Sequence, residues 1–200
     1  MHRLGFVIFP GFQVMGFASM TAFEVANLVV EEPFYKLTLV SENGGPVRAS
    51  AGFSVDTVAF ARRSFDSVFI GAGTGVTKAT PGLIKFVQRS MATSRRIVAP
   101  CTGAFVLAEA GVLDGRRATT HWNFTRDLRN RFPKVSVEED RIYIIDGPVW
   151  TSAGMTAGID LALAMIEKDL GAETARSVAR KLVVHQRRAG ALGILARRHV

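Results

Sequence analysis

Cys101 is the only cysteine in this sequence of 200 residues, and its neighbours place it where a nucleophile could act. Residues 95–110 read RRIVAPCTGAFVLAEA, in which a short β-branched run passes through Pro-Cys-Thr-Gly-Ala into a helical Ala/Leu/Val pattern. The predicted strand-to-helix turn would push the cysteine out at the carboxyl edge of a sheet, beside the first helical N–H groups. Because a helix N-terminus lowers the pKa of a thiol, Cys101 could act as a thiolate.

His121 is the partner that the spacing offers to this cysteine. It follows a short strand expected at 116–120, and in a parallel sheet that strand would end at the same edge as Cys101. A free cysteine is more often a small buried hydrophobe, but the Cys101–His121 pair favours the functional interpretation. His185 is expected inside the last basic helix, as a structural or surface residue.

A complete triad would also need a carboxylate that orients the histidine or exchanges a proton with the thiol. The loop at 10–20 should reach the same edge, yet it contains no acid. Glu24 falls inside the next helix, while Asp146 and Asp160 are equally well explained as a turn residue and a helix-face residue. The sequence therefore predicts a cysteine and a histidine without their acidic partner.

A glycine-rich loop, GAGTG at 71–75, forms a second strand-to-helix junction. It lacks the sixth-position Gly or Ala of a dinucleotide fingerprint, and no strand ending in an acid follows at the required distance. We interpret Gly71 and Gly73 as parts of a tight loop whose backbone N–H groups approach a ligand or an oxyanion. No cofactor and no metal site is predicted.

Strands that alternate with helices place these residues in an α/β domain. The expected fold is a single-domain, three-layer α/β/α sandwich with a mainly parallel central sheet over residues 1–188, followed by a basic tail at 189–200. Expected strands are 4–9, 34–41, 67–70, 116–120, 135–137, 141–145 and 149–151, with a hairpin-like excursion at 46–58 on a sheet edge. Expected helices are 17–30, 81–91, 123–132, 153–170 and 173–188, the last two divided at Gly171.

The composition is that of a globular protein, with 48% hydrophobic and 21% charged residues. No apolar run approaches the roughly 20 residues of a membrane span, and the run at 4–9 is too short for a signal peptide. One cysteine cannot form an internal disulfide. We therefore expect a cytoplasmic protein without membrane contact.

Most of the net charge of +8 lies in the C-terminal segment. From residue 171 onward, seven Lys/Arg stand against one acid, Glu173, so six of the eight net positive charges lie there. Such a segment could face nucleic acid, but the apolar residues between the basic ones favour a docking helix with a solvated face.

Five blocks carry a resemblance to a known family: VIFPGFQ at 7–13, ANL at 26–28, LVSENGGPVRAS at 39–50, PCTGAFVLAEAGVLDGRRATTHW at 100–122 and VWTSAGMTAGIDLALAMIE at 149–167. The chain resembles the ThiJ/PfpI superfamily, whose fold is flavodoxin-like and class I glutamine amidotransferase-like. More narrowly, it resembles the sensor domain that precedes the DNA-binding region of AraC-type transcriptional regulators. The resemblance maps Cys101 and His121 onto the elbow cysteine and its partner histidine, and it implies a homodimer.

Three departures limit what the resemblance implies. Superfamily enzymes usually carry an acid in or just after the first loop, which this chain lacks. The superfamily's proteases tend to have histidine after the cysteine, where this chain has Thr102, so a peptidase is disfavoured. In the regulators the last helix leads into about one hundred more residues with two helix-turn-helix motifs, which this sequence of 200 residues does not include.

The first hypothesis is a ligand-sensing domain of an AraC-type regulator that reaches DNA only through a C-terminal helix-turn-helix region not present in this chain. Its small-molecule effector would bind in a pocket made by Gly71, Gly73, Cys101, Thr102, His121 and Trp122. The alternative is an isonitrile hydratase, amidase or glyoxalase-like enzyme in which the Cys101 thiolate, assisted by His121, attacks an electrophilic carbon. Backbone N–H groups of Thr102 and Gly73 would then hold the anion. A third hypothesis is a redox-responsive protein with an exposed, acidified Cys101.

Overall fold

The computed structural model describes residues 1–61, 63–154 and 156–184, and its centre is an eight-stranded mixed sheet. The strand order is β3-β4-β2-β1-β5-β6-β10-β9, in which the six inner strands run parallel and the edge strands β3 and β9 run antiparallel to their neighbours. The strands are β1 (His2–Val7), β2 (Tyr35–Ser41), β3 (Gly45–Arg48), β4 (Ser54–Ala59), β5 (Ser67–Ile70), β6 (Arg96–Pro100), β9 (Tyr143–Asp146) and β10 (Val149–Ser152).

The central strands are buried along their whole length because both faces of the sheet are covered. Every residue of β5, β6 and β10 is buried, whereas β4 is nowhere fully buried. The hairpin of β3 and β4 lies at one edge, as predicted for 46–58. The mainly parallel sheet and the α/β class are thus confirmed.

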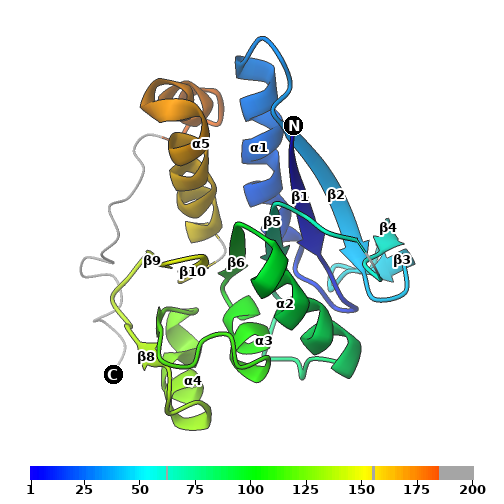
Figure 1. The fold of residues 1–200 in the computed structure, drawn as a ribbon, viewed down its shortest axis with the longest axis vertical. Helices are drawn as coiled ribbons and strands as arrows, with labels where there is room; N and C mark the ends of the chain where they lie inside the picture. The colour runs from blue at the N-terminus through cyan, green and yellow to red at the C-terminus, as the bar shows by residue number, and fades with distance from the viewer. Residues whose placement is uncertain (62, 155, 185–200) are drawn as a thin grey trace.

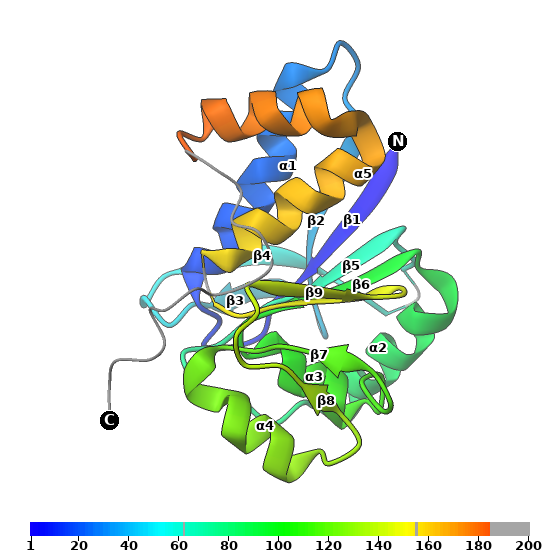
Figure 2. The same cartoon turned by 90° about the vertical axis from the view of Figure 1, so that its left-hand side faces the viewer.

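In the part of the chain that the structure describes, five α-helices cover the two faces and complete the three layers. In the second view, α1 and α5 lie above the sheet and α2, α3 and α4 lie below it (Figures 1 and 2). The helices are α1 (Phe17–Val29), α2 (Pro81–Thr93), α3 (Gly103–Glu109), α4 (Thr125–Arg131) and α5 (Ala157–Lys181). None of them is both long and apolar enough to span a membrane, within the residues described.

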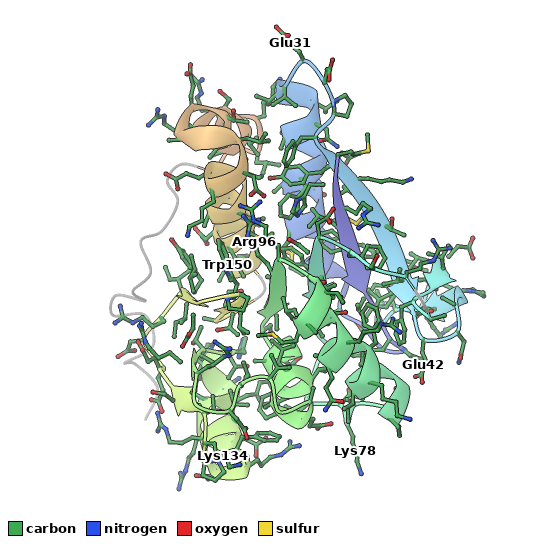
Figure 3. All side chains as sticks on the ribbon, viewed as in Figure 1. Glu31, Glu42, Lys78, Arg96, Lys134 and Trp150 are labelled. Carbon is green, nitrogen blue, oxygen red and sulfur yellow. The ribbon has the colours of Figure 1, made fainter. Side chains whose placement is uncertain are left out.

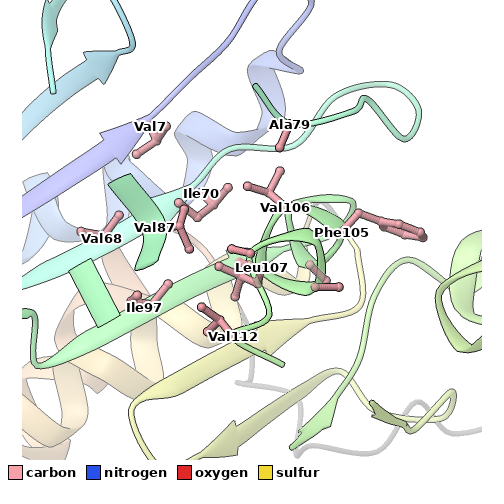
Figure 4. Packing of buried hydrophobic residues seen from close by; sticks show 14 of the residues in the cluster. Val7, Val68, Ile70, Ala79, Val87, Ile97, Phe105, Val106, Leu107 and Val112 are labelled. Carbon is pink, nitrogen blue, oxygen red and sulfur yellow. The ribbon is translucent and has the colours of Figure 1, made fainter. Parts of the chain in front are cut away.

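Each face has its own hydrophobic core. Below the sheet, Val87 of α2 and Leu107 of α3 pack towards Val68 and Ile97 on the strands (Figure 4). Above it, side chains of α1 and α5 pack on the opposite face of the same strands. The central strands β5 and β6 therefore contribute side chains to both cores, as the pleat of a buried strand requires.

The long C-terminal helix is kinked where the sequence predicted a division. Gly171 has a φ of +86°, which is outside the helical range, so two helical segments meet there at an angle. The second segment ends at Lys181. The expected helix end at 188, His185 and the tail at 189–200 lie outside the described residues.

The strand expected at 116–120 does not join the central sheet. Instead β7 (Arg117–Ala118) pairs with β8 (Ser136–Val137) in a separate two-stranded sheet. The position next to β6 is occupied by β10, whose parallel pairing with β6 runs from Val149↔Ile97 to Ser152↔Pro100. The prediction that His121 ends a strand of the parallel sheet is therefore wrong.

At the amino edge of the sheet, a buried ion pair joins α5 to β6. The carboxylate of Asp169 accepts hydrogen bonds from Arg96 at 2.7 and 2.5 Å, and the Arg96 guanidinium lies over the Trp150 ring at 5.2 Å (Figure 3). Arg95 approaches the same carboxylate at 3.0 Å. This cluster is at the opposite end of β6 from Cys101.

Candidate functional site

Cys101 lies at the turn between β6 and α3, as predicted, with a φ of +54°. Positive φ is unfavourable for a residue with a side chain and is commonly retained at functional sites. Two hydrogen bonds hold the strained residue: its N–H donates to the carbonyl of Ser152 at 2.9 Å, and the Thr120 hydroxyl donates to its carbonyl at 2.7 Å. The nucleophile-elbow geometry is therefore present.

The elbow packs closely against its neighbours because two glycines, Gly71 and Gly103, let backbone atoms of adjacent elements approach each other. A Cβ on Gly103, the first residue of α3, would lie 2.6 Å from the carbonyl oxygen of Ile70. A Cβ on Gly71 would lie 2.7 Å from the carbonyl oxygen of Val7. At Gly71 the absence of a side chain is thus explained by packing between β1 and β5.

The 71–75 loop lies directly against the elbow. The N–H of Gly73 donates to the hydroxyl oxygen of Thr102 at 3.1 Å, and that hydroxyl is 3.3 Å from the Gly73 carbonyl. The first loop lies beside it, since the N–H of Gln13 donates to the carbonyl of Ala72 at 2.8 Å. Both loops follow the carboxyl ends of β5 and β1, where the strand order reverses direction, the usual place for a ligand in an open α/β sheet.

The bond between Gly73 and Thr102 changes the enzyme hypothesis. Because the Gly73 N–H already donates to a side chain, it is not a free donor for an oxyanion. Of the two donors that the sequence suggested for an oxyanion, the Gly73 N–H is therefore occupied as the site stands.

The thiol itself is buried and has a raised pKa. Only 5% of Cys101 is exposed, and this burial raises the pKa of its thiol more than the hydrogen bonds from the Thr102 backbone and side chain lower it. The expected exposed, acidified cysteine is therefore wrong.

His121 lies near the elbow, but its side chain contacts other residues. Its ring is half-buried, it stacks on Trp122 at 5.6 Å, and its Nδ1 accepts the Asn123 N–H at 3.3 Å. In the described part of the chain, no hydrogen bond joins its side chain to Cys101. Burial lowers the pKa of His121, and no carboxylate raises it.

The three candidate acids lie in different places. Glu24 is exposed on α1, and Asp160 is buried in the first turn of α5. Asp146 accepts the Arg117 N–H at 2.8 Å and lies at the turn before β10, the opposite edge from Cys101. None of the three contributes to the pKa of Cys101 or of His121.

Two serines lie behind the elbow, and no pattern in the sequence predicts that they do. The hydroxyls of Ser19 and Ser152 are buried and have no hydrogen-bond partner in the described structure. Ser19 contacts Gly158, where a Cβ would lie 2.4 Å from the serine oxygen and 3.7 Å from Pro100. Isolated serines are common, so only the tertiary structure brings these two to the elbow.

The open space near the elbow is small. A cavity of about 20 Å³ is lined by Gln13, Gly16, Phe17, Gly71 and Pro100, among others. Trp122 is 53% exposed at the rim of the site. A larger cavity of about 620 Å³ has none of the six predicted ligand-binding residues in its walls. Within the described residues, no group of three or more His, Cys, Asp and Glu could hold a metal ion.

The fold and the elbow together define a class of protein, and comparison with known sequences agrees. A family model described as "DJ-1/PfpI family" matches residues 5–168, so the chain belongs to the DJ-1/PfpI family. The resemblance found in the sequence is thereby confirmed.

Individual relatives include both transcriptional regulators and an enzyme. The chain is 39% identical over 183 residues to the HTH-type transcriptional regulator CdhR of Pseudomonas aeruginosa, covering 90% of this chain and 54% of that protein. It is 32% identical over 180 residues to the isonitrile hydratase of Pseudomonas putida, covering 88% of this chain and 75% of the enzyme. A solved structure of an AraC family transcriptional regulator from Pseudomonas putida superposes with a TM-score of 0.83 at 21% identity, over 91% of this chain and 100% of that one. The chain spans about half the length of the curated regulators that it matches.

Proposed function

We propose that this chain is the ligand-sensing domain of an AraC-type transcriptional regulator. A small metabolite would bind at the elbow, against Cys101, Thr102, His121, Trp122 and the 71–75 loop. The domain would act as a homodimer and bias DNA binding by a helix-turn-helix region outside this chain.

The observation that carries the proposal is an enzyme-like elbow without activating groups. The Cys101 thiol is buried with a raised pKa, and the nearby His121 has no carboxylate to orient it. A nucleophile needs the thiolate and a base within reach. A ligand pocket needs only a shaped surface with a few polar groups, such as the half-buried His121. The regulators among the relatives point in the same direction.

A thermal-shift screen of small amines, amino acids and betaines tests ligand binding. An effector at 100 times its dissociation constant should stabilise the domain by about 2.7 kcal/mol. Trp122→Ala should weaken its binding, while Phe53→Ala, which removes another exposed ring outside the elbow, should leave the affinity unchanged. Equal affinities for both variants would contradict an effector site at the elbow.

The reading frame downstream of residue 200 tests the regulatory part. A helix-turn-helix region in the same frame is expected. A gene that ends here without one would remove most of the support for a regulator.

The second candidate is a cysteine-dependent enzyme of the isonitrile hydratase type. The strained φ of Cys101 and the 32% identity to an isonitrile hydratase favour it. The wild type would then turn over an isonitrile, an amide or an aldehyde, and Cys101→Ala would lose all turnover. Absence of wild-type turnover on all three classes would leave this candidate without support.

A further inference from the structure

The largest space described above lies away from the elbow, between the sheet and α2. This α2 cavity has a volume of about 620 Å³, which falls in the range of small-molecule sites, roughly 300–1,000 Å³. Val7 at the end of β1, Ala79 before α2 and Val106 on α3 belong to its walls (Figure 4). The space is larger than the packing gaps of an ordinary core and is large enough to hold a small molecule.

The floor of the α2 cavity is apolar. Val7, Phe60, Leu83 and Val106 line it and are buried, and Phe60 stacks on Phe86 at 4.4 Å. These residues come from β1, the end of β4, α2 and α3, so the floor is rigid and built from several elements. It would bury the hydrocarbon part of a ligand.

One polar group in the wall has a hydrogen-bond partner. The carboxylate of Glu42, in the turn after β2, accepts the Thr80 hydroxyl at 2.5 Å. Thr80 is also the N-cap of α2, since its hydroxyl oxygen accepts the Leu83 N–H at 3.1 Å. Figure 3 shows Glu42 near the foot of the β3–β4 hairpin.

Gly82 makes room for that carboxylate. A Cβ at this position would lie 1.8 Å from Oε1 of Glu42 and 2.7 Å from its Cδ. Glycine is otherwise unfavourable inside a helix. The sequence thus has a weak helix former at the one place where the Glu42 side chain crosses α2.

No cationic side chain of the described residues neutralises Glu42. Arg48 and Lys78 belong to the rim of the α2 cavity, but both are exposed and neither forms an ion pair with it. A half-buried carboxylate with a hydrogen-bond partner orients a ligand better than exposed cations do. Its lone pairs beyond the Thr80 bond remain free for a donor.

We propose that the α2 cavity is a small-molecule site separate from the elbow, and that it takes a compact apolar molecule with a protonated amine that binds Glu42. The amine stays protonated at neutral pH, because alkylamines titrate near pH 10. The proposal concerns ligand binding by this chain and does not depend on its being part of a regulator.

Three matched probes test it by calorimetry or ligand-observed NMR on the full chain: 4-phenylbutylamine, 4-phenylbutan-1-ol and 4-phenylbutyrate. Molecules of this size should bind with millimolar dissociation constants, the amine about tenfold more tightly than the alcohol. Glu42→Gln should remove this preference while leaving alcohol binding unchanged, and Gly82→Ala should do the same by displacing the carboxylate. Thr77→Trp, at the mouth of the α2 cavity, should weaken the binding of all three probes. Lys85→Trp, on the outer face of α2, should leave the binding of all three unchanged.

Variants of the elbow separate the two sites. Cys101→Ser and Trp122→Ala should leave the amine affinity unchanged. In protein-observed NMR, the amide shifts caused by the amine should centre on Leu83 rather than on Gly73. Tighter binding of the carboxylate than of the amine, or an unchanged preference in Glu42→Gln, would overturn the proposal. No binding of any probe at about 10 mM, well above the expected dissociation constants, would overturn it as well.

Discussion

Replacing Asp169 by alanine should destabilise this fold strongly. The Asp169 side chain has no exposed surface, and the Arg96 side chain that donates two hydrogen bonds to it is only 4% exposed. Tyr35 adds a third hydrogen bond at 3.2 Å. Without Asp169 the guanidinium of Arg96 stays buried without a counter-charge, at a cost of about 3–5 kcal/mol. In a chain of this size the melting temperature should fall by about 10 °C.

Thermal and urea unfolding measure this loss, and a surface pair supplies the control. Arg129 and Glu139 are 2.9 Å apart with both side chains 50% exposed, so Glu139→Ala should lose less than about 1 kcal/mol. The double variant Arg96→Met/Asp169→Leu should recover part of the loss, because it leaves no buried charge. If Asp169→Ala loses no more stability than Glu139→Ala, the reasoning is refuted.

The Arg96–Asp169 pair should also make the stability of the fold depend on pH, in a direction that follows from the pKa of Asp169. Burial raises the pKa of Asp169, but the hydrogen bonds and charge of Arg96 outweigh it, so the pKa lies below its ordinary value. A carboxyl with a depressed folded pKa stabilises above its unfolded pKa, and this stabilisation is lost as the pH falls through the folded value. The advantage of the wild type over Asp169→Asn should therefore shrink below about pH 4.

Three further predictions concern the elbow. Because burial raises the pKa of Cys101, its alkylation by iodoacetamide should be slower than that of free cysteine at about pH 7 and still rising at about pH 9; a plateau near neutrality, seen by mass spectrometry, would contradict this. Gly103→Ala should lose about 1–3 kcal/mol in urea unfolding because its Cβ meets the β5 carbonyl at 2.6 Å, whereas Gly75→Ala, with nothing within 4 Å, should change little. Thr102→Val should lose about 1–2 kcal/mol and speed hydrogen exchange at Gly73, whose N–H loses its acceptor; unchanged exchange would show that the bond is not maintained in solution.

Much of the fold could be predicted from local patterns. Apolar runs at 67–70 and 149–151, and Pro81 at the start of a helix, correspond to β5, β10 and α2 because fully buried strands and capped helices have strong local signals. The elbow at Cys101 was predicted for the same reason. Positive φ at Gly171 needs no distant contact either, so the kink in α5 could be predicted.

The environment of the elbow could not be predicted in the same way. His121 was placed at the end of a parallel strand, but β7 pairs with β8 because β10 occupies the place beside β6. Hydrophobic periodicity and strand propensity predict that a segment is a strand, but they do not predict which other strand it pairs with. The Thr120 hydroxyl, not a shared sheet edge, brings this segment to Cys101.

The sequence by itself determined the α/β class, the family, the elbow cysteine and the absence of an acid in the first loop, since these depend on residue types and short-range order. Only the tertiary structure decided the state of the thiol, the use of the Gly73 N–H by Thr102, and the α2 cavity with Glu42 in its wall. The burial of a thiol, the partner of a hydrogen bond and the volume of a cavity depend on residues far apart in the chain, so no local sequence pattern predicts them.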